Sequence, residues 1–231
     1  MNGPPDDAAV VMSQGWGVLH LFGDTSSATD AHALKRAVAA CEAADHSVVC
    51  VAMLGHRAQV GFMALGPDLW TLRRFQRDVI AAGIALSDSY VSMTELSEYA
   101  QGLPEQMRND RLYPKLPPAG KRAMCFYPMS KRRDEGANWY ALPFDERKEL
   151  MLGHGKKGRE YAGKVLQLIS GSTGLDDWEW AVTLFAADPA DLKRIVYEMR
   201  FDPASAVYGE FGRFLTGLVL DIDTLCDELG L

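Results

Sequence analysis

Residues 47–65, SVVCVAMLGHRAQVGFMAL, decide the fold of this chain. They hold two runs rich in β-forming residues, 47–54 and 58–65, separated only by the turn-forming tripeptide GHR. Two such runs joined by three residues that include glycine predict a β-hairpin. The hairpin therefore forms the centre of the predicted order of strands and helices.

Two segments with helical spacing of apolar residues flank this hairpin, at 30–44 and at 69–82. Ser and Thr residues precede the first segment, and a Pro-Asp pair precedes the second, as is typical of helix starts. Strand-like runs at 16–22 and 86–93 complete the set. The order is βαββαβ, which is that of a ferredoxin-like unit.

The same order returns in the second half of the chain. The elements expected there are strands at 123–128, 165–170, 178–185 and 207–215 and helices at 145–161 and 189–199. We therefore predict an α+β protein with two tandem ferredoxin-like (βαββαβ) repeats, of the dimeric α+β barrel type.

The domain organisation follows from these repeats. The first repeat is expected at 14–99, and the second, which carries the candidate site, at 122–217. Between them, residues 100–121 contain four prolines and predict a connecting segment. Residues 1–13 predict a flexible N-terminus and residues 218–231 a C-terminal tail.

Composition and charge limit the classes of function. The chain has 231 residues, a formal net charge of −7 and a mean hydropathy of −0.11, values typical of a globular protein. The negative charge disfavours binding to nucleic acid or to an anionic membrane. The start lacks the basic region of a signal peptide, no apolar run approaches the length of a membrane span, and the four scattered cysteines indicate reduced thiols. We therefore expect a cytoplasmic protein.

One histidine stands out in the second half. His154 lies between two glycines in a predicted helix, and the apolar Leu150 and Met151 precede it on the same helix face. Glycines inside a helix cost about 1 kcal/mol each relative to alanine, which is reasonable where a flat, bulky group must approach the backbone. A haem with one axial histidine fits this pattern. A histidine packed in the core of a weak helix is the alternative.

The stretch CFYPMSKRR, residues 125–133, is the second candidate feature. Strand periodicity places Tyr127, Met129 and Lys131 on one face, so a phenol, a thioether and an ammonium share a surface. The basic residues at its end could bind carboxylates. The simpler alternative is a solvated strand end.

The second half resembles the chlorite dismutase-like superfamily, and within it the coproheme decarboxylases. The motifs YPMSK, NWY, the HG helix, YAGKV, GLDD and YEMRFD follow in the order and spacing of that family. The resemblance is dense from residue 125 onward and weaker before it. It implies two ferredoxin-like repeats per subunit and a ring of five subunits, a homopentamer.

The resemblance also implies a reaction. Iron-coproporphyrin III (coproheme) would be both substrate and cofactor, and hydrogen peroxide would oxidise it so that two propionates become vinyl groups. The product would be protohaem (haem b), formed through a monovinyl intermediate in the last step of haem biosynthesis. A coproporphyrin ferrochelatase is the expected source of the substrate by direct hand-off.

The resemblance assigns roles to single residues. His154 would be the iron ligand, Tyr127 the radical-forming phenol, and Lys131 the residue that holds a reactive propionate. Further residues would contact the porphyrin, namely Pro128, Met129, Ser130, Gln167 on the distal face, and Ser205. The family's arginine that precedes the Tyr strand aligns with Tyr113 here, so we assign its role to the nearby Arg111.

Two other functions fit the same family. A chlorite dismutase carries a distal arginine where this chain has the neutral Gln167, which disfavours chlorite as a substrate. A haem peroxidase would oxidise dyes, and a non-catalytic haem carrier would bind haem tightly and form no product with peroxide.

Overall fold

The computed structural model describes residues 8–100 and 102–231, so the N-terminal segment predicted at 1–13 lies mainly outside the described residues. The first repeat has the predicted order of elements. These are β1 (Gly17–Asp24), α1 (Ala31–Glu42), β2 (Ser47–Leu54), β3 (Val60–Gly66), α2 (Leu69–Ala81) and β4 (Ala85–Thr94). The hairpin at 47–65 is confirmed, because β2 and β3 pair antiparallel from Ser47↔Leu65 to Ala52↔Val60.

The second repeat follows after a short helix, α3 (Glu105–Leu112). Its elements are β5 (Ala123–Lys131), β6 (Arg133–Asp134), β7 (Ala137–Asn138), the 3₁₀ turn η1 (Trp139–Ala141), α4 (Phe144–Arg159), β8 (Val165–Gly171), β9 (Trp180–Ala186), α5 (Pro189–Met199), α6 (Pro203–Ala206), β10 (Gly209–Phe211) and β11 (Leu215–Leu220). The last helix is α7 (Ile222–Glu228).

The strands of both repeats form one closed barrel. The sheet has nine strands in the order β10-β5-β11-β2-β3-β1-β4-β8-β9, and a further pairing of β5 with β9 joins its ends. Leaving out β10, which lies beside β5, eight antiparallel strands form a ring. The predicted fold class, two tandem ferredoxin-like repeats of the α+β barrel type, is therefore confirmed.

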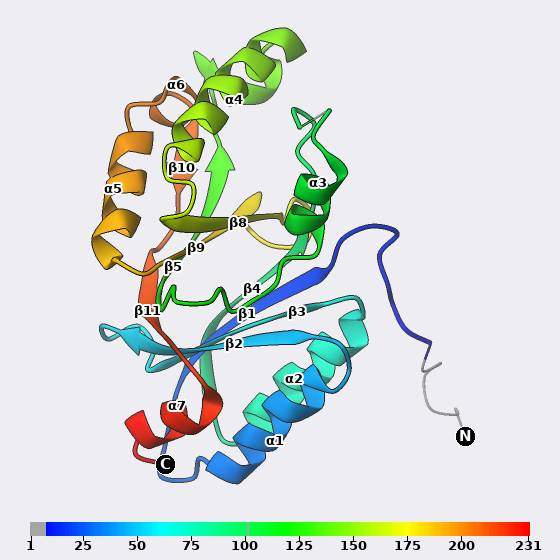
Figure 1. Cartoon of the computed structure of the whole chain (residues 1–231), viewed down its shortest axis with the longest axis vertical. Helices are drawn as coiled ribbons and strands as arrows, with labels where there is room; N and C mark the ends of the chain where they lie inside the picture. Colours follow the sequence, from blue (N-terminus) through cyan, green and yellow to red (C-terminus); the bar gives the residue numbers. More distant parts are fainter. Residues whose placement is uncertain (1–7, 101) are drawn as a thin grey trace.

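The helices cover the outside of the barrel in two groups (Figure 1). Helices α1, α2 and α7 pack on the sheet of the first repeat, and α5 packs on the sheet of the second. Inside the barrel, apolar side chains from both repeats form a shared core, for example Phe22 from β1 and Phe126 from β5. The two repeats therefore share one hydrophobic core and form a single folding unit.

Aspartate side chains fix the starts of the helices. Each accepts a hydrogen bond from a backbone N–H of the first helical turn, which would otherwise lack a partner. The residues that act in this way are Asp30, Asp68, Asp188, Asp202 and Asp221. All helices in the described part of the chain are too short or too polar to cross a lipid bilayer.

The last strand differs from the sequence prediction. We expected it at 207–215, but only Gly209–Phe211 pairs there, and the main strand is Leu215–Leu220. Gly217 makes this strand hard to recognise in the sequence, because a glycine inside a strand normally weakens it. Here a Cβ at Gly217 would lie 2.5 Å from the Ala52 carbonyl oxygen, so the close approach of β11 to β2 requires glycine.

Two other segments hold more structure than the sequence indicated. The connecting segment contains α3, whose eight residues lie between the prolines. The segment expected as a C-terminal tail contains the end of β11 and all of α7. Leu225 and Cys226 of α7 are buried against the helices of the first repeat, so this segment belongs to the core.

Candidate active site

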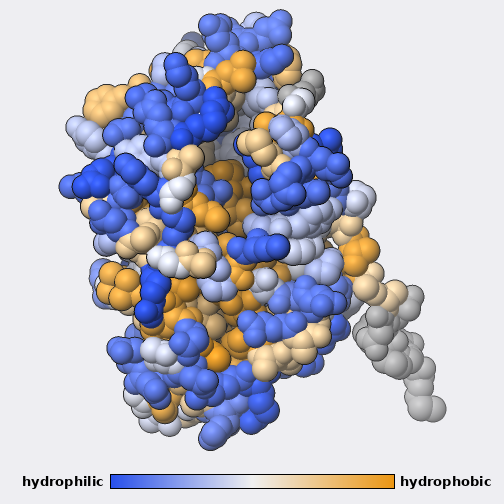
Figure 2. All heavy atoms as spheres, in the orientation of Figure 1, coloured by the Kyte–Doolittle hydropathy of each residue, from blue (hydrophilic) through white to orange (hydrophobic). Residues whose placement is uncertain are grey.

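Helix α4 packs differently from the other long helices. It begins after Pro143, has acidic residues in its first turn and basic residues in its last, and these charges favour a helix. Yet none of its residues is buried, whereas α1, α2 and α5 each bury several. Figure 2 shows a hollow with apolar side chains beside α4, on the face where β8 lies. The inner face of α4 is therefore open to a further group.

His154 lies on α4 where this helix packs against α6, and a buried carboxylate holds its ring. Nδ1 of His154 is 2.8 Å from Oδ2 of Asp202, whose side chain is only 3% exposed. A carboxylate accepts hydrogen bonds, so Nδ1 carries a proton, and in the neutral ring this leaves the Nε2 lone pair for a metal ion. This is the arrangement of a metal-binding histidine with its supporting carboxylate. His154 is part-exposed, and a Cβ at the adjacent Gly153 would meet no atom within 4 Å.

The short helix α6 brings three predicted residues together. Asp202 caps this helix by accepting a hydrogen bond from the backbone N–H of Ser205, at 3.2 Å. Nζ of Lys131 donates to the carbonyl oxygen of Ala204 in the same helix, at 2.6 Å. His154, Lys131 and Ser205 come from distant parts of the sequence, and α6 connects all three.

Lys131 is a buried cation with few charged neighbours. Its Nζ lies 4.4 Å from the centre of the Trp139 ring, and its backbone N–H donates to Oε2 of Glu179 at 2.8 Å. Burial lowers the pKa of Lys131 to about 8, while the carboxylates of Asp202 and Glu179 oppose this shift. An ammonium has three N–H donors, so one that is bonded to Ala204 can still bind a carboxylate.

Tyr127 and Met129 share the same face of β5, in an apolar cluster under α5. The phenol ring stacks on Phe214 with 4.4 Å between ring centres and lies 5.9 Å from Phe211. Burial raises the pKa of Tyr127 above its ordinary value, and Arg200 opposes the shift. The phenol is therefore held neutral, between aromatic rings, on the strand that also carries Lys131.

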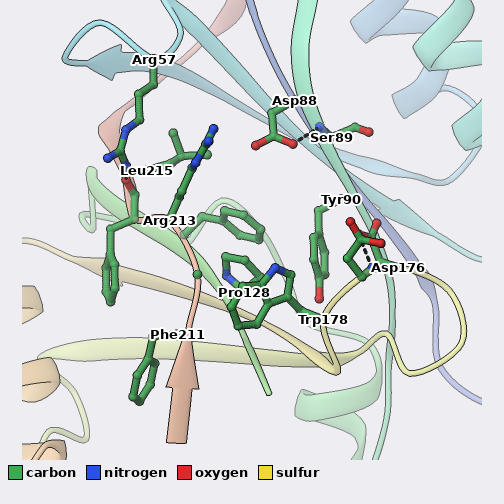
Figure 3. A pocket seen from close by; sticks show the side chains of 14 residues that line it. Arg57, Asp88, Ser89, Tyr90, Pro128, Asp176, Trp178, Phe211, Arg213 and Leu215 are labelled. Atoms are coloured by element: carbon green, nitrogen blue, oxygen red, sulfur yellow. Dashed lines mark hydrogen bonds between the residues drawn. The ribbon is translucent and has the colours of Figure 1, made fainter. Parts of the chain in front are cut away.

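Two of the predicted porphyrin contacts point elsewhere. Pro128 lines a cavity of about 710 Å³ at one end of the barrel, together with Tyr90 and Trp178 (Figure 3). The hydroxyl of Ser130 accepts a hydrogen bond from the backbone N–H of Glu179, at 3.2 Å. Alternate residues of a strand face opposite sides, so neither side chain shares the face of Tyr127.

Gln167 faces the helix that carries His154. It lies on β8, is exposed, and its Nε2 donates to the carbonyl oxygen of Gly158 at 3.3 Å. A Cβ at Gly158 would lie 3.4 Å from that nitrogen, which is about van der Waals contact with a flexible side chain. Gln167 therefore contacts α4 at Gly158, four residues after His154 in the same helix.

Arg111 is not brought to the other predicted residues by any contact in the described residues. It is exposed in the last turn of α3. The neighbouring Tyr113 packs edge-on against Trp16, with 5.4 Å between ring centres, and its phenol accepts a hydrogen bond from Gly15 N–H at 3.4 Å. The role given to Arg111 stays a prediction.

Three contacts at the candidate site could not be identified from the sequence. Asp202 supports His154, Trp139 lies against Lys131, and Arg200 stacks on Phe211 at 4.1 Å beside the Tyr127 cluster. The motifs NWY and MRFD contain all three, so the signal was present. Their partners could not be identified because the contacts join separate elements.

Comparisons with known proteins agree on one family. A family model described as chlorite dismutase matches residues 27–220. A coproheme decarboxylase of Staphylococcus saprophyticus is 46% identical over 187 residues, which cover 77% of this chain and 74% of that protein. A Natronomonas pharaonis protein named for heme binding is 50% identical over 181 residues, covering 71% of this chain. This chain spans only 30% of the length of that relative.

Solved structures show the same fold. A heme-binding protein from Thermus thermophilus superposes with a TM-score of 0.83 at 39% identity, covering 97% of this chain and 98% of that chain. A mutant chlorite dismutase from Candidatus Nitrospira defluvii superposes with a TM-score of 0.75 at 16% identity, covering 95% of this chain and 98% of that chain. The second similarity concerns the fold alone.

Proposed function

The chain belongs to the chlorite dismutase family, and we propose from this premise that it is a peroxide-dependent coproheme decarboxylase. The substrate would be iron-coproporphyrin III and the product haem b. The name of the staphylococcal relative, at 46% identity, supports this choice within the family.

The observation that carries the proposal is the pair of His154 and Asp202. A histidine whose Nδ1–H is held by a buried carboxylate, on a helix face that the protein leaves open, suits an axial ligand of a porphyrin iron. A planar macrocycle with His154 on one side and Gln167 on the other would require the hydrogen bond from Gln167 to Gly158 of α4 to open.

Tyr127 and Lys131 supply what decarboxylation needs beyond iron. Lys131 Nζ would hold a propionate carboxylate with a donor that Ala204 does not use. The phenol of Tyr127, two pleats away on the same face of β5, would then take a hydrogen atom from the propionate's β-carbon. Fixing one propionate beside one phenol is the main contribution of this geometry.

The stoichiometry of this chemistry is simple. A propionic acid side chain loses two electrons, two protons and carbon dioxide to become a vinyl group. One hydrogen peroxide takes up those electrons and protons and becomes two waters. Each propionate therefore consumes one peroxide.

Chlorite decomposition is the second candidate, and Gln167 argues against it. Its amide carries no charge. A guanidinium at this place would attract an oxyanion, and an amide does so only weakly. A haem carrier without activity would need neither the buried Lys131 nor the stacked Tyr127.

The test is a peroxide titration of purified protein loaded with ferric coproporphyrin III. Chromatography with mass detection should show the monovinyl intermediate after about one equivalent of peroxide and haem b after about two. The same protein should release no oxygen from chlorite. Oxygen release from chlorite, or an unchanged porphyrin after peroxide, would refute the proposal.

The remaining expectations concern assembly and cellular context. We propose a homo-oligomer, with five subunits by family resemblance, a cytoplasmic location, and receipt of coproheme from a ferrochelatase. Exposed Leu54 on β2 and Leu218 on β11 support the assembly, since they lie on one face where these strands pair.

A further inference from the structure

We propose that Arg57, in the first repeat, is a positioning residue for Tyr127 in the second. Its guanidinium holds the segment between β10 and β11, and this keeps Phe214 stacked on the phenol ring. The inference rests on the proposed function of Tyr127 and adds a residue from the half of the chain that lacks His154, Tyr127 and Lys131.

The carbonyl oxygen of Phe214, in the segment 212–214, needs a hydrogen-bond donor from outside the neighbouring strand β5. Phe211 pairs with Met129 and Leu215 pairs with Phe126, and between them the Gly212 N–H donates to the carbonyl oxygen of Pro128 at 2.8 Å. Pro128, which lies opposite, has no N–H group to donate. Nη1 of Arg57 donates to the carbonyl oxygen of Phe214 at 2.9 Å.

This hydrogen bond acts on the residue that covers Tyr127. The Phe214 ring lies 4.4 Å from the Tyr127 ring with an angle of 23° between the planes. Tyr127 is 8% exposed. If Phe214 moved, the Tyr127 ring could adopt several orientations. Its phenol would also be exposed to water. A group that must lose an electron and a proton at one defined position is sensitive to both changes.

Arg57 is itself held in place. It lies in the turn between β2 and β3, and its carbonyl oxygen accepts a hydrogen bond from Oγ of Ser87 at 3.3 Å. Figure 3 shows its side chain reaching from that turn toward the segment that carries Arg213 and Leu215, at the rim of the 710 Å³ cavity. Arg57 therefore joins the strands of the first repeat to the cover of Tyr127.

Arg213 provides a matched control. It lines the same cavity from the same segment and is exposed. Within residues 8–100 and 102–231, the structure gives its side chain no hydrogen bond or ion pair. A substitution there removes an equal charge from the same cavity and leaves the bond to Phe214 intact.

The first test uses hydrogen exchange in the protein without porphyrin. In Arg57→Met, the amide of Gly212, whose N–H donates to the Pro128 carbonyl oxygen, should exchange about fivefold faster, as expected for loss of one surface hydrogen bond from its segment. Arg57→Lys should restore part of the protection, and Arg213→Met should leave it unchanged. Equal exchange in Arg57→Met and wild type would overturn the proposal, whatever reaction the protein catalyses.

The second test follows the phenol itself. Electron paramagnetic resonance after peroxide addition to the coproheme-loaded protein reports the ring orientation of a tyrosyl radical, with Tyr127→Phe as the blank. In Arg57→Met we expect a broader signal and several-fold slower product formation, with coproheme affinity within about twofold of wild type. An unchanged signal would overturn the positioning role. Wild-type protein that forms no product would instead refute the proposed function.

Discussion

Replacing Asp202 by Asn removes the charge that holds the His154 ring and keeps an oxygen that can cap α6. The wild-type bond is a 2.8 Å contact with a carboxylate that is almost fully buried. Hydrogen bonds to charged groups contribute about 1.5–3 kcal/mol, against about 1 kcal/mol for neutral ones. The substitution should therefore cost about 1 kcal/mol or somewhat more at this histidine.

That cost should appear as weaker porphyrin binding. Changes to the partner of a metal-binding histidine typically lower affinity 10- to 100-fold. His154 is 31% exposed, which favours the lower end, so we expect the Kd for ferric coproporphyrin III to rise about tenfold. An absorbance titration of wild type and Asp202→Asn at equal ionic strength measures this change.

Two further variants separate binding from stability. Asp202→Ala also removes the cap of α6, which should lower the free energy of unfolding by about 1 kcal/mol more than Asp202→Asn does. Asp188→Asn alters an equivalent cap, at α5, where no histidine is bound. If Asp202→Asn bound the porphyrin as tightly as wild type, or Asp188→Asn weakened binding equally, the role given to Asp202 would be wrong.

The other predictions concern single groups and the assembly. Tyr127→Phe should bind coproheme nearly as well as wild type yet form neither the monovinyl intermediate nor haem b, and normal product yields would place the radical elsewhere. Burial lowers the pKa of Lys131 from 10.5 to about 8, so between these values the unfolded chain binds more protons. The free energy of unfolding should therefore gain a contribution as pH rises from about 8 to 10.5, and denaturant titrations of Lys131→Met should lack it. Burial likewise lowers the pKa of His20 from 6.5 to about 3, so stability should fall as pH drops from 6.5 toward 3. A similar acid loss in His20→Gln would contradict this assignment. Leu218→Glu should reduce the oligomer mass in light scattering, and a monomeric wild type would refute the proposed assembly.

The sequence predicted the order of elements well because that order rests on local periodicity. The hairpin at 47–65 and both helices beside it follow from spacing alone. The last strand was placed too early because Gly217 is explained only by the close approach of β2. Local patterns therefore determine the repeats, whereas contacts between repeats decide the details.

The site was predictable to a smaller extent. Family motifs pointed to His154, Tyr127 and Lys131, and strand periodicity placed the last two on one face of β5. The contact of Asp202 with His154 could not be predicted, because the two are 48 residues apart and only the packing of α6 against α4 brings them together. Supporting residues of this kind depend on tertiary structure, which no short motif encodes.

The closed ring of strands also constrains how the chain reaches its native state during synthesis. The sheet of the first repeat has two outer strands, β2 and β4, whose partners β11 and β8 lie far downstream. Until those partners leave the ribosome, both edges stay open to pairing with other chains. Such long-range pairing forms late and slowly. We therefore expect the first repeat to need protection by chaperones during translation, and porphyrin loading to follow ring closure.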